Sequence, residues 1–167
     1  MQSNLPEKLN IARTLCANYH MSMKKHELNL KSQLCHRLYI ASNAMTRSYK
    51  PLLDEIGLSY PQYLVMMALW EEDKISMSEL ATVTYIDTGS LTLVVKKMAD
   101  KGLLKIVNGE EDKRKKFIHL TSQGANLQKR AIDIPEKMKC KLVSLDSAEI
   151  EGAFSLLDKL NHDLTNS

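Results

Sequence analysis

The feature that most constrains the fold is a pair of helix-start signals lying close together in the middle of the chain. Ser76 and Glu79 have the spacing of a capping box, which predicts a short helix over residues 77–84. Asp87 is suited to cap a second helix, over residues 88–101. Only a tight turn fits between the two helices, so the segment predicts a helix-turn-helix.

A glycine and two short apolar segments follow the second helix. Gly102 is suited to end that helix in the left-handed conformation. Residues 103–107 and 116–120 read as strands, and they flank a polar loop over 108–115, which predicts a hairpin with a charged tip. A helix-turn-helix followed directly by a hairpin predicts a winged helix-turn-helix, which we place over residues 59–121.

A further helix start precedes the helix-turn-helix. Ser59 and Gln62 form another capping box, with Pro61 in the first turn, and they predict a helix that ends at the acidic run 71–73. The apolar spacing predicts that the buried side of this helix consists of Leu64, Met67, Ala68 and Trp70.

Long helices with one apolar side are predicted on both flanks of the winged region. Residues 30–56 repeat apolar side chains every three or four positions, in a helix that Pro51 bends or divides. After the hairpin we expect a helix over 122–142 with a kink at Pro135. A last helix is expected to begin after Asp146, which starts a third capping box.

The order of these segments predicts the organisation of the chain. Apolar helix sides outside a small compact middle can be buried by pairing with a second subunit. We therefore expect residues 30–58 and 122–167 to form a dimerisation region, and we interpret the polar residues 1–29 as a loosely held, disordered N-terminal arm. The predicted fold is mainly α with a small β-hairpin wing, a winged helix-turn-helix with N- and C-terminal dimerisation helices.

Composition excludes several classes of protein. With 44% hydrophobic and 26% charged residues, the 167-residue chain can build a packed core. No apolar run reaches the roughly 18 residues of a membrane helix. The first thirty residues lack the apolar stretch of a secretory signal, so we expect a cytoplasmic protein with no membrane partner. The three cysteines and five histidines lack metal-ligand spacing, so neither a metal nor a cofactor is expected.

The positive charge of the chain is concentrated in one segment. The net charge is only +3, but between Thr88 and His119 eight Lys or Arg stand against four Asp or Glu. This segment therefore carries the whole excess of positive charge. Such clustering favours binding to DNA phosphates.

The residue types within this segment also suit DNA. The first turn of the 88–101 helix presents small hydroxyl side chains, which suit a helix placed in the major groove. In the hairpin, Arg114 is suited to a narrow minor groove, with Asp112 placed to orient it. The same residues also fit a solvated hairpin tip and ordinary helix capping. The candidate DNA-binding residues are Thr88, Gly89, Ser90, Thr92, Lys96, Asp112 and Arg114.

Three stretches of the sequence resemble a known family. QLCHRLYIASNAMTRSYKPLLDEIGLSYPQYLVMMALWE, YIDTGSLTLVVKKMADKGLL and the Asp112-Lys113-Arg114 wing resemble the MarR-type winged-helix transcription regulators. The first is similar to the OhrR-type branch, which senses organic hydroperoxides. The resemblance covers residues 30 to about 165. It implies a homodimer with a recognition helix in each of two successive major grooves of a pseudo-palindromic operator, roughly 34 Å apart.

Cys35 is the candidate peroxide sensor. Peroxide reacts with thiolate, and a free cysteine with a pKa of about 8.5 is mostly protonated at neutral pH. Tyr39 lies four residues later on the same side of the helix, where its hydroxyl can donate a hydrogen bond that favours the anion. The resemblance implies that Tyr49 and Tyr60 of the other subunit reach the same thiol. From the residues alone, Cys35 also fits a buried, unreactive cysteine.

Cys140 resembles the resolving cysteine of the two-cysteine OhrR-type proteins. In those proteins a sulfenic acid on the sensor condenses with the resolving thiol of the other subunit. The resemblance thus implies a repressor that binds DNA when reduced and is released when organic hydroperoxides oxidise Cys35, through an intersubunit disulfide with Cys140. Capping of Cys35 by a small thiol is the alternative. Cys16 is assigned no role.

Two other functions remain open at this point. One is a MarR-type repressor that a small phenolic ligand releases from DNA, with Cys35 incidental. The other is a thiol peroxidase, which needs a route for recycling its cysteine. The sequence contains no CxxC pair for that purpose, so we expect a single oxidation and no enzyme activity.

Overall fold

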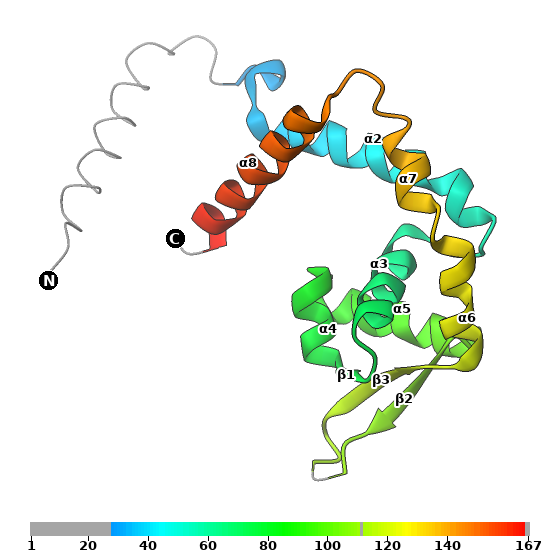
Figure 1. Cartoon of the computed structure of the whole chain (residues 1–167). Coiled ribbons are helices and arrows are strands. Elements are labelled where there is room, and N and C mark those ends of the chain that lie inside the picture. The colour runs from blue at the N-terminus through cyan, green and yellow to red at the C-terminus, as the bar shows by residue number, and fades with distance from the viewer. Residues whose placement is uncertain (1–27, 111, 166–167) are drawn as a thin grey trace, which may run out of the picture. The chain divides into compact units, whose positions relative to one another are not determined.

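The computed structural model describes residues 28–110 and 112–165 (Figure 1). The chain divides into two compact units, with the boundary after Met45. Cys16 and nearly all of the arm predicted over residues 1–29 lie outside the described residues.

The first described unit contains a short turn and the beginning of a long helix. A 3-10 turn, η1 (Leu30–Ser32), precedes α2 (Leu34–Asp54), so the α-helix begins later than the predicted residue 30. The Asn29 side chain accepts a hydrogen bond from the Lys31 N–H at 3.0 Å, and this local bond competes with α-helical geometry. α2 then continues to Asp54 as one helix with Pro51 inside it, so Pro51 does not divide it.

The second unit contains the helix-turn-helix. It is built from α3 (Tyr60–Glu71), α4 (Met77–Thr84) and α5 (Thr88–Asp100). The predicted caps are present: the Ser76 N–H donates to Glu79 Oε2 at 2.8 Å, and the Glu79 N–H donates to Ser76 Oγ at 3.2 Å. Gly102 has a φ of +73° and ends α5, as predicted.

A three-stranded antiparallel sheet follows in the order β1-β3-β2. The hairpin consists of β2 (Leu104–Asn108) and β3 (Lys116–Leu120), which confirms the predicted wing. The third strand, β1 (Ile75–Ser76), was not predicted. It has only two residues and exists because Ile75 pairs with Ile118, a contact between residues far apart in the sequence.

The core of the second unit surrounds α3, and here the prediction was wrong. Met67 is 41% exposed, and Leu64, Ala68 and Trp70 are only partly buried. The helix packs against α4, α5 and α6 (Ser122–Ala131), so a broad side of it is covered and a single stripe does not describe it. The apolar side chains of α3 that are buried are Tyr63, Val65, Met66 and Leu69.

Trp70 has a structural role at the edge of this core. Its indole Nε1–H donates to the Gly124 carbonyl oxygen at 3.0 Å, which joins α3 to α6. A side chain at Gly124 would collide with the carbonyl oxygen of Leu103. The close approach of these two backbones therefore requires glycine at this position.

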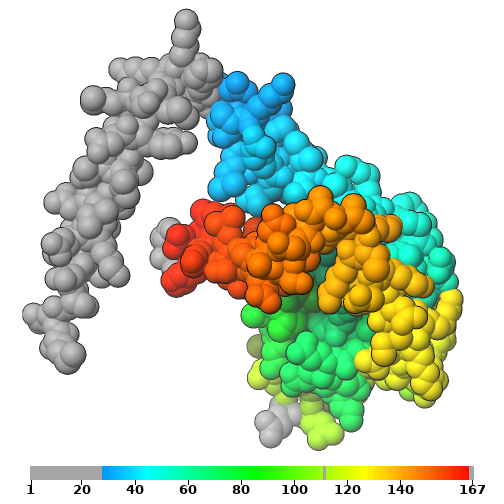
Figure 2. Space-filling view, turned by 45° about the horizontal axis from the view of Figure 1, so that its top comes forward, coloured from blue at the N-terminus to red at the C-terminus, as the bar shows by residue number. Residues whose placement is uncertain are grey.

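The C-terminal part differs from the prediction in one respect. The helix expected over 122–142 is two helices, α6 and α7 (Ile134–Lys139). Pro135 lies in the first turn of α7, where its missing N–H costs no hydrogen bond, so it starts a helix and does not kink one. α8 (Ser147–Thr165) follows the predicted capping box and buries none of its residues; its orange-to-red side chains lie at the surface in Figure 2.

Candidate functional site

The exposed side of α5 carries the predicted groove-reading residues. Thr88, Gly89, Ser90, Thr92 and Lys96 are all exposed. The opposite side of the helix is anchored in the core by Leu91, Val95 and Met98. Burial of these three side chains fixes which side of the helix faces outward, so the hydroxyl groups and the lysine share the accessible side.

Hydrogen bonds in the first turn of α5 limit what the helix offers to DNA. Asp87 Oδ1 accepts from the Gly89 N–H at 3.0 Å and from the Ser90 N–H at 3.1 Å. These bonds, led by those from Ser90, lower the pKa of Asp87. The Thr92 hydroxyl donates to the Thr88 carbonyl oxygen at 2.8 Å, so its proton is engaged and its oxygen can act only as an acceptor. The first turn therefore presents side-chain hydroxyls, while two of its backbone N–H groups are already bonded to Asp87.

The tip of the wing is a turn organised by Asp112. Asp112 Oδ1 accepts from the backbone N–H of Arg114 at 2.9 Å, and its carbonyl oxygen accepts from the Lys115 N–H at 3.0 Å. We expected Asp112 to orient the Arg114 side chain; in the described chain the contact is made to the Arg114 backbone. Asp112 thus shapes the turn, and the exposed Arg114 guanidinium group remains available to a ligand.

A cluster of aromatic rings lies where α2 meets α3. The rings of Tyr49 and Tyr60 have centroids 5.1 Å apart, so two of the predicted thiol-supporting residues are brought together. Tyr63 was not predicted from the sequence; its ring centroid lies 5.9 Å from that of Tyr49 and 6.4 Å from that of Trp70. Its position one helical turn after Tyr60 was the available signal.

The environment of these tyrosines keeps them protonated. Burial raises the pKa of Tyr49, Tyr60 and Tyr63, and for Tyr49 and Tyr63 the neighbouring phenols raise it further. A neutral phenol is a hydrogen-bond donor. The cluster can therefore donate to an anion such as a thiolate.

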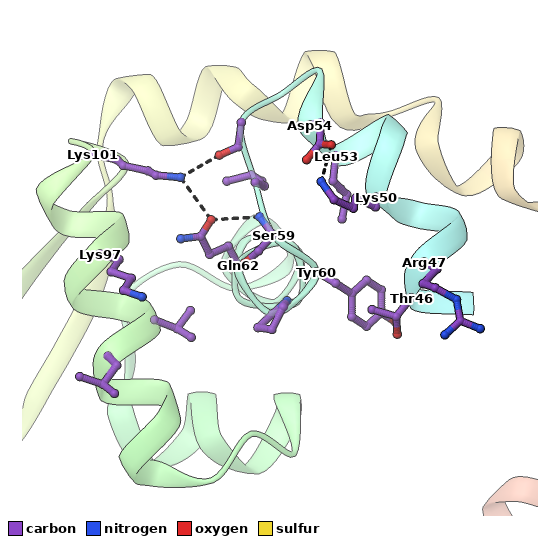
Figure 3. Close-up of a pocket in the computed structure, with 15 residues that line it drawn as sticks. Thr46, Arg47, Lys50, Leu53, Asp54, Ser59, Tyr60, Gln62, Lys97 and Lys101 are labelled. Carbon is purple, nitrogen blue, oxygen red and sulfur yellow. Dashed lines mark hydrogen bonds and ion pairs between the residues drawn. The ribbon is translucent and has the colours of Figure 1, made fainter. Parts of the chain in front are cut away.

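A hollow of about 740 Å³ lies beside this cluster, between the second half of α2 and α5 (Figure 3). Its walls include apolar side chains such as Leu53, Leu58 and Leu93. Positively charged groups also line it, and one of them, Lys50, forms an ion pair with Asp54 at 2.7 Å. The other cationic side chains of the hollow are Arg47, Lys97 and Lys101.

The two predicted redox cysteines are free and exposed. Cys35 is the second residue of α2, and Tyr39 on the same helix is 68% exposed. In residues 28–45 no hydrogen bond joins the Tyr39 hydroxyl to the Cys35 thiol. Cys140 follows α7 as its C-cap residue. The pairing of Cys35 with Cys140, Tyr49 and Tyr60 stays a prediction, because it joins residues of two different subunits.

The described residues contain neither a metal-binding cluster nor a membrane-spanning helix. Within residues 28–110 and 112–165, no group of three or more His, Cys, Asp or Glu side chains is placed to hold a metal ion. Over the same ranges, none of the helices combines the length and the apolar character that crossing a membrane requires.

Comparisons with known proteins point to transcription regulation. The family model described as transcriptional regulator SarA/Rot matches residues 47–131. The organic hydroperoxide resistance transcriptional regulator of Bacillus subtilis is 42% identical over 115 residues, which cover 69% of this chain and 78% of that protein.

Solved structures share the fold. The structure of reduced AbfR bound to DNA has a TM-score of 0.70 and 27% identity, and the match covers 85% of this chain and 98% of AbfR. A mutant of MarR from E. coli in complex with operator DNA has a TM-score of 0.73 at 21% identity, with 80% of this chain and 97% of that chain covered. The exposed helix α5 and the wing thus belong to a fold that has been solved on DNA.

Proposed function

Because the chain belongs to the MarR family of winged-helix transcription regulators, we propose that it is a repressor that responds to organic hydroperoxides. It binds a pseudo-palindromic operator as a homodimer while Cys35 is reduced, and it leaves the DNA when Cys35 is oxidised. The observation that carries this proposal is the 42% identity to a regulator of organic hydroperoxide resistance. The relatives are regulators of transcription, so the chain is not an enzyme.

The DNA-binding half of the proposal is supported by α5 and the wing. Thr88, Ser90 and Thr92 present hydroxyl groups on one accessible side, followed by Lys96, and this combination suits base edges and phosphates in the major groove. Arg114 extends from a turn that Asp112 holds in shape. An arginine at such a tip suits the negative potential of a narrow minor groove.

The sensing half is supported by the phenol cluster. Tyr49 and Tyr60 lie together and stay protonated, so they can donate hydrogen bonds to a thiolate that enters from a partner subunit. We propose that this thiolate is Cys35 of the second copy. Stabilising the anion raises the fraction of Cys35 that can attack a peroxide at neutral pH.

The proposed chemistry proceeds in two steps. The Cys35 thiolate attacks the terminal peroxide oxygen, the O–O bond breaks, and the products are a sulfenic acid and an alkoxide that takes a proton to become an alcohol. The Cys140 thiol of the other subunit then attacks the sulfenic sulfur, which forms a disulfide and releases water. A disulfide requires Cα atoms about 4.4–6.8 Å apart, so its formation fixes a new arrangement of the helices that carry the two cysteines.

The test measures operator affinity before and after oxidation. A duplex selected from a random pool by the reduced protein serves as probe, and one equivalent of cumene hydroperoxide is the oxidant. We expect the oxidised protein to lose at least tenfold in affinity, and Cys35→Ser protein to bind the duplex and ignore the peroxide. Unchanged affinity in fully oxidised wild-type protein would refute the sensing role.

A matched variant distinguishes an intersubunit disulfide with Cys140 from capping of Cys35 by a small thiol. Cys140→Ser protein cannot form the intersubunit disulfide, so we expect it to run as a monomer on a non-reducing gel after treatment, while wild-type protein runs as a dimer. Cys16→Ser protein serves as the control and should behave like the wild type. A covalent dimer that persists without Cys140 would show that another cysteine resolves the sulfenic acid.

The hollow beside Tyr60 favours a second candidate function. Apolar walls combined with the cationic groups of Arg47 and Lys97 suit a small aromatic acid. Such a ligand would release DNA without any change at Cys35. Titration with salicylate under reducing conditions tests this function, and release of the wild-type protein by salicylate together with no effect of peroxide would favour it.

A further inference from the structure

Lys101, at the C-terminal end of the recognition helix α5, makes two hydrogen bonds across the molecule. Its Nζ donates to the carbonyl oxygen of Gly57 at 2.8 Å and to Oε1 of Gln62 at 3.3 Å. Figure 3 shows both bonds, with the lysine side chain extending from α5 to the corner where α2 ends and α3 begins. Its ammonium group is therefore directed toward the protein and not toward a ligand on the outer side of α5.

The acceptors of these bonds are held in place. Gln62 is 6% exposed and is the one buried polar side chain in the core of the described residues. Its Oε1 also accepts from the Ser59 N–H at 3.0 Å, so the same oxygen caps α3 and receives Lys101. Gly57 has a φ of +72°, a conformation that fixes where its carbonyl oxygen points and that suits glycine.

We propose that Lys101 is a positioning residue for DNA binding: it holds the C-terminal end of α5 against the α2–α3 corner and does not contact a phosphate. The proposal rests on the DNA-binding role of α5 argued above. The proposal gives Lys101 a different role from the other lysines of the positively charged segment between Thr88 and His119. Charge alone would assign all of them to DNA phosphates.

The length of the helix explains why its far end matters. α5 has 13 residues and is about 20 Å long, and the groove-reading residues lie at the end opposite to Lys101. A tilt of about 5° moves that end by about 1.7 Å, whereas hydrogen bonds to base edges tolerate only about 0.5 Å. A contact that fixes the C-terminal end therefore controls whether Thr88 and Ser90 reach their partners.

Salt dependence distinguishes positioning from phosphate contact. A lysine that neutralises a phosphate releases a counterion, so its loss lowers the slope of log affinity against log salt by about one. A positioning lysine lowers affinity without changing that slope. The probe is the duplex selected by the reduced wild-type protein, and all proteins are compared in the reduced state.

We expect Lys101→Met to weaken binding at least tenfold at every salt concentration while the salt slope stays that of the wild type. Lys96→Met is the comparison, because Lys96 lies on the exposed side of the same helix and is expected to lower the slope by about one. Lys101→Met protein that binds within twofold of the wild type, or that shows the lowered slope, overturns the proposal. An unchanged slope for Lys96→Met would instead count against the proposed phosphate contact of Lys96, so the two failures are distinguishable.

A second pair of variants keeps the test informative if Lys101→Met protein is poorly folded. Gln62→Glu retains an acceptor for both Lys101 and Ser59, so we expect its affinity to stay within twofold of the wild type. Gln62→Leu removes the acceptor, and we expect at least a threefold loss of affinity with an unchanged salt slope in protein that circular dichroism shows to be folded. Wild-type affinity in folded Gln62→Leu protein would contradict the proposal. In a double-mutant cycle, Gln62→Leu should cost less in Lys101→Met than in wild-type protein; additive losses would likewise contradict the proposal.

Discussion

The winged region and the C-terminal helix α8 differ in whether their apolar side chains are buried within one chain. In the winged region the large apolar residues Leu80, Leu91 and Ile118 are fully buried within one chain. In α8, by contrast, Leu156, Leu157 and Leu164 lie exposed on one side, and none of the residues of that helix is buried. A row of exposed apolar side chains on a long helix is typical of an interface. The comparison indicates that the winged region is complete in one chain, whereas we propose that α8 is completed by a second copy.

The largest effect that tests this comparison is expected in the core of the winged region. Leu91 is completely buried, so Leu91→Ala should lower the free energy of unfolding by about 2–5 kcal/mol. Leu93 lies on the same helix and is 62% exposed, so Leu93→Ala should change it by no more than about 0.5 kcal/mol. Urea denaturation followed by circular dichroism measures both. Equal losses for the two variants would show that the winged region is not packed as described.

A smaller effect is expected on association, from α8. Leu157→Asp places a charge on the proposed interface and removes a side chain whose burial contributes about 1.5–3 kcal/mol, so the dimer dissociation constant should rise at least tenfold. Ser155→Asp adds the same charge to the same helix at a polar position and serves as control. Sedimentation equilibrium gives the dissociation constants. If Leu157→Asp protein dimerises as tightly as the wild type, α8 is not part of the interface.

The same contrast explains what the sequence could predict. Helix starts at Ser59, Ser76 and Asp87 were predicted because capping depends on residues within three positions of one another. The buried side of α3 was predicted wrongly because it depends on which distant elements cover the helix. β1 was missed for a related reason, since two residues become a strand only by pairing with β3.

In the candidate site, too, features set by neighbouring residues could be predicted, and features set by distant residues could not. The exposed side of α5 followed from its cap and its apolar spacing, both of which are local. The contact from Lys101 to Gly57 joins residues 44 positions apart, and nothing in the spacing of the sequence indicates it. The surroundings proposed for Cys35 involve a second chain. Local patterns can name that thiol as a candidate, but they do not specify its neighbours.

The smallest effect is expected at the cap of α5 and depends on pH. Hydrogen bonds from Ser90 and Gly89 hold the pKa of Asp87 below its ordinary value of 3.8. A carboxylate with a lowered pKa stabilises the folded state above its unfolded pKa, and this contribution is lost as the pH falls through the folded pKa. Asp87→Asn retains a capping oxygen and cannot titrate, so its stability should fall less steeply between pH 5 and pH 2 than that of the wild type. Glu79 titrates in the same direction in both proteins, so the difference between their urea denaturation curves isolates Asp87. Identical pH dependence would mean that the Asp87 cap is not formed in solution, and the orientation of the first turn of α5 would then need another cause.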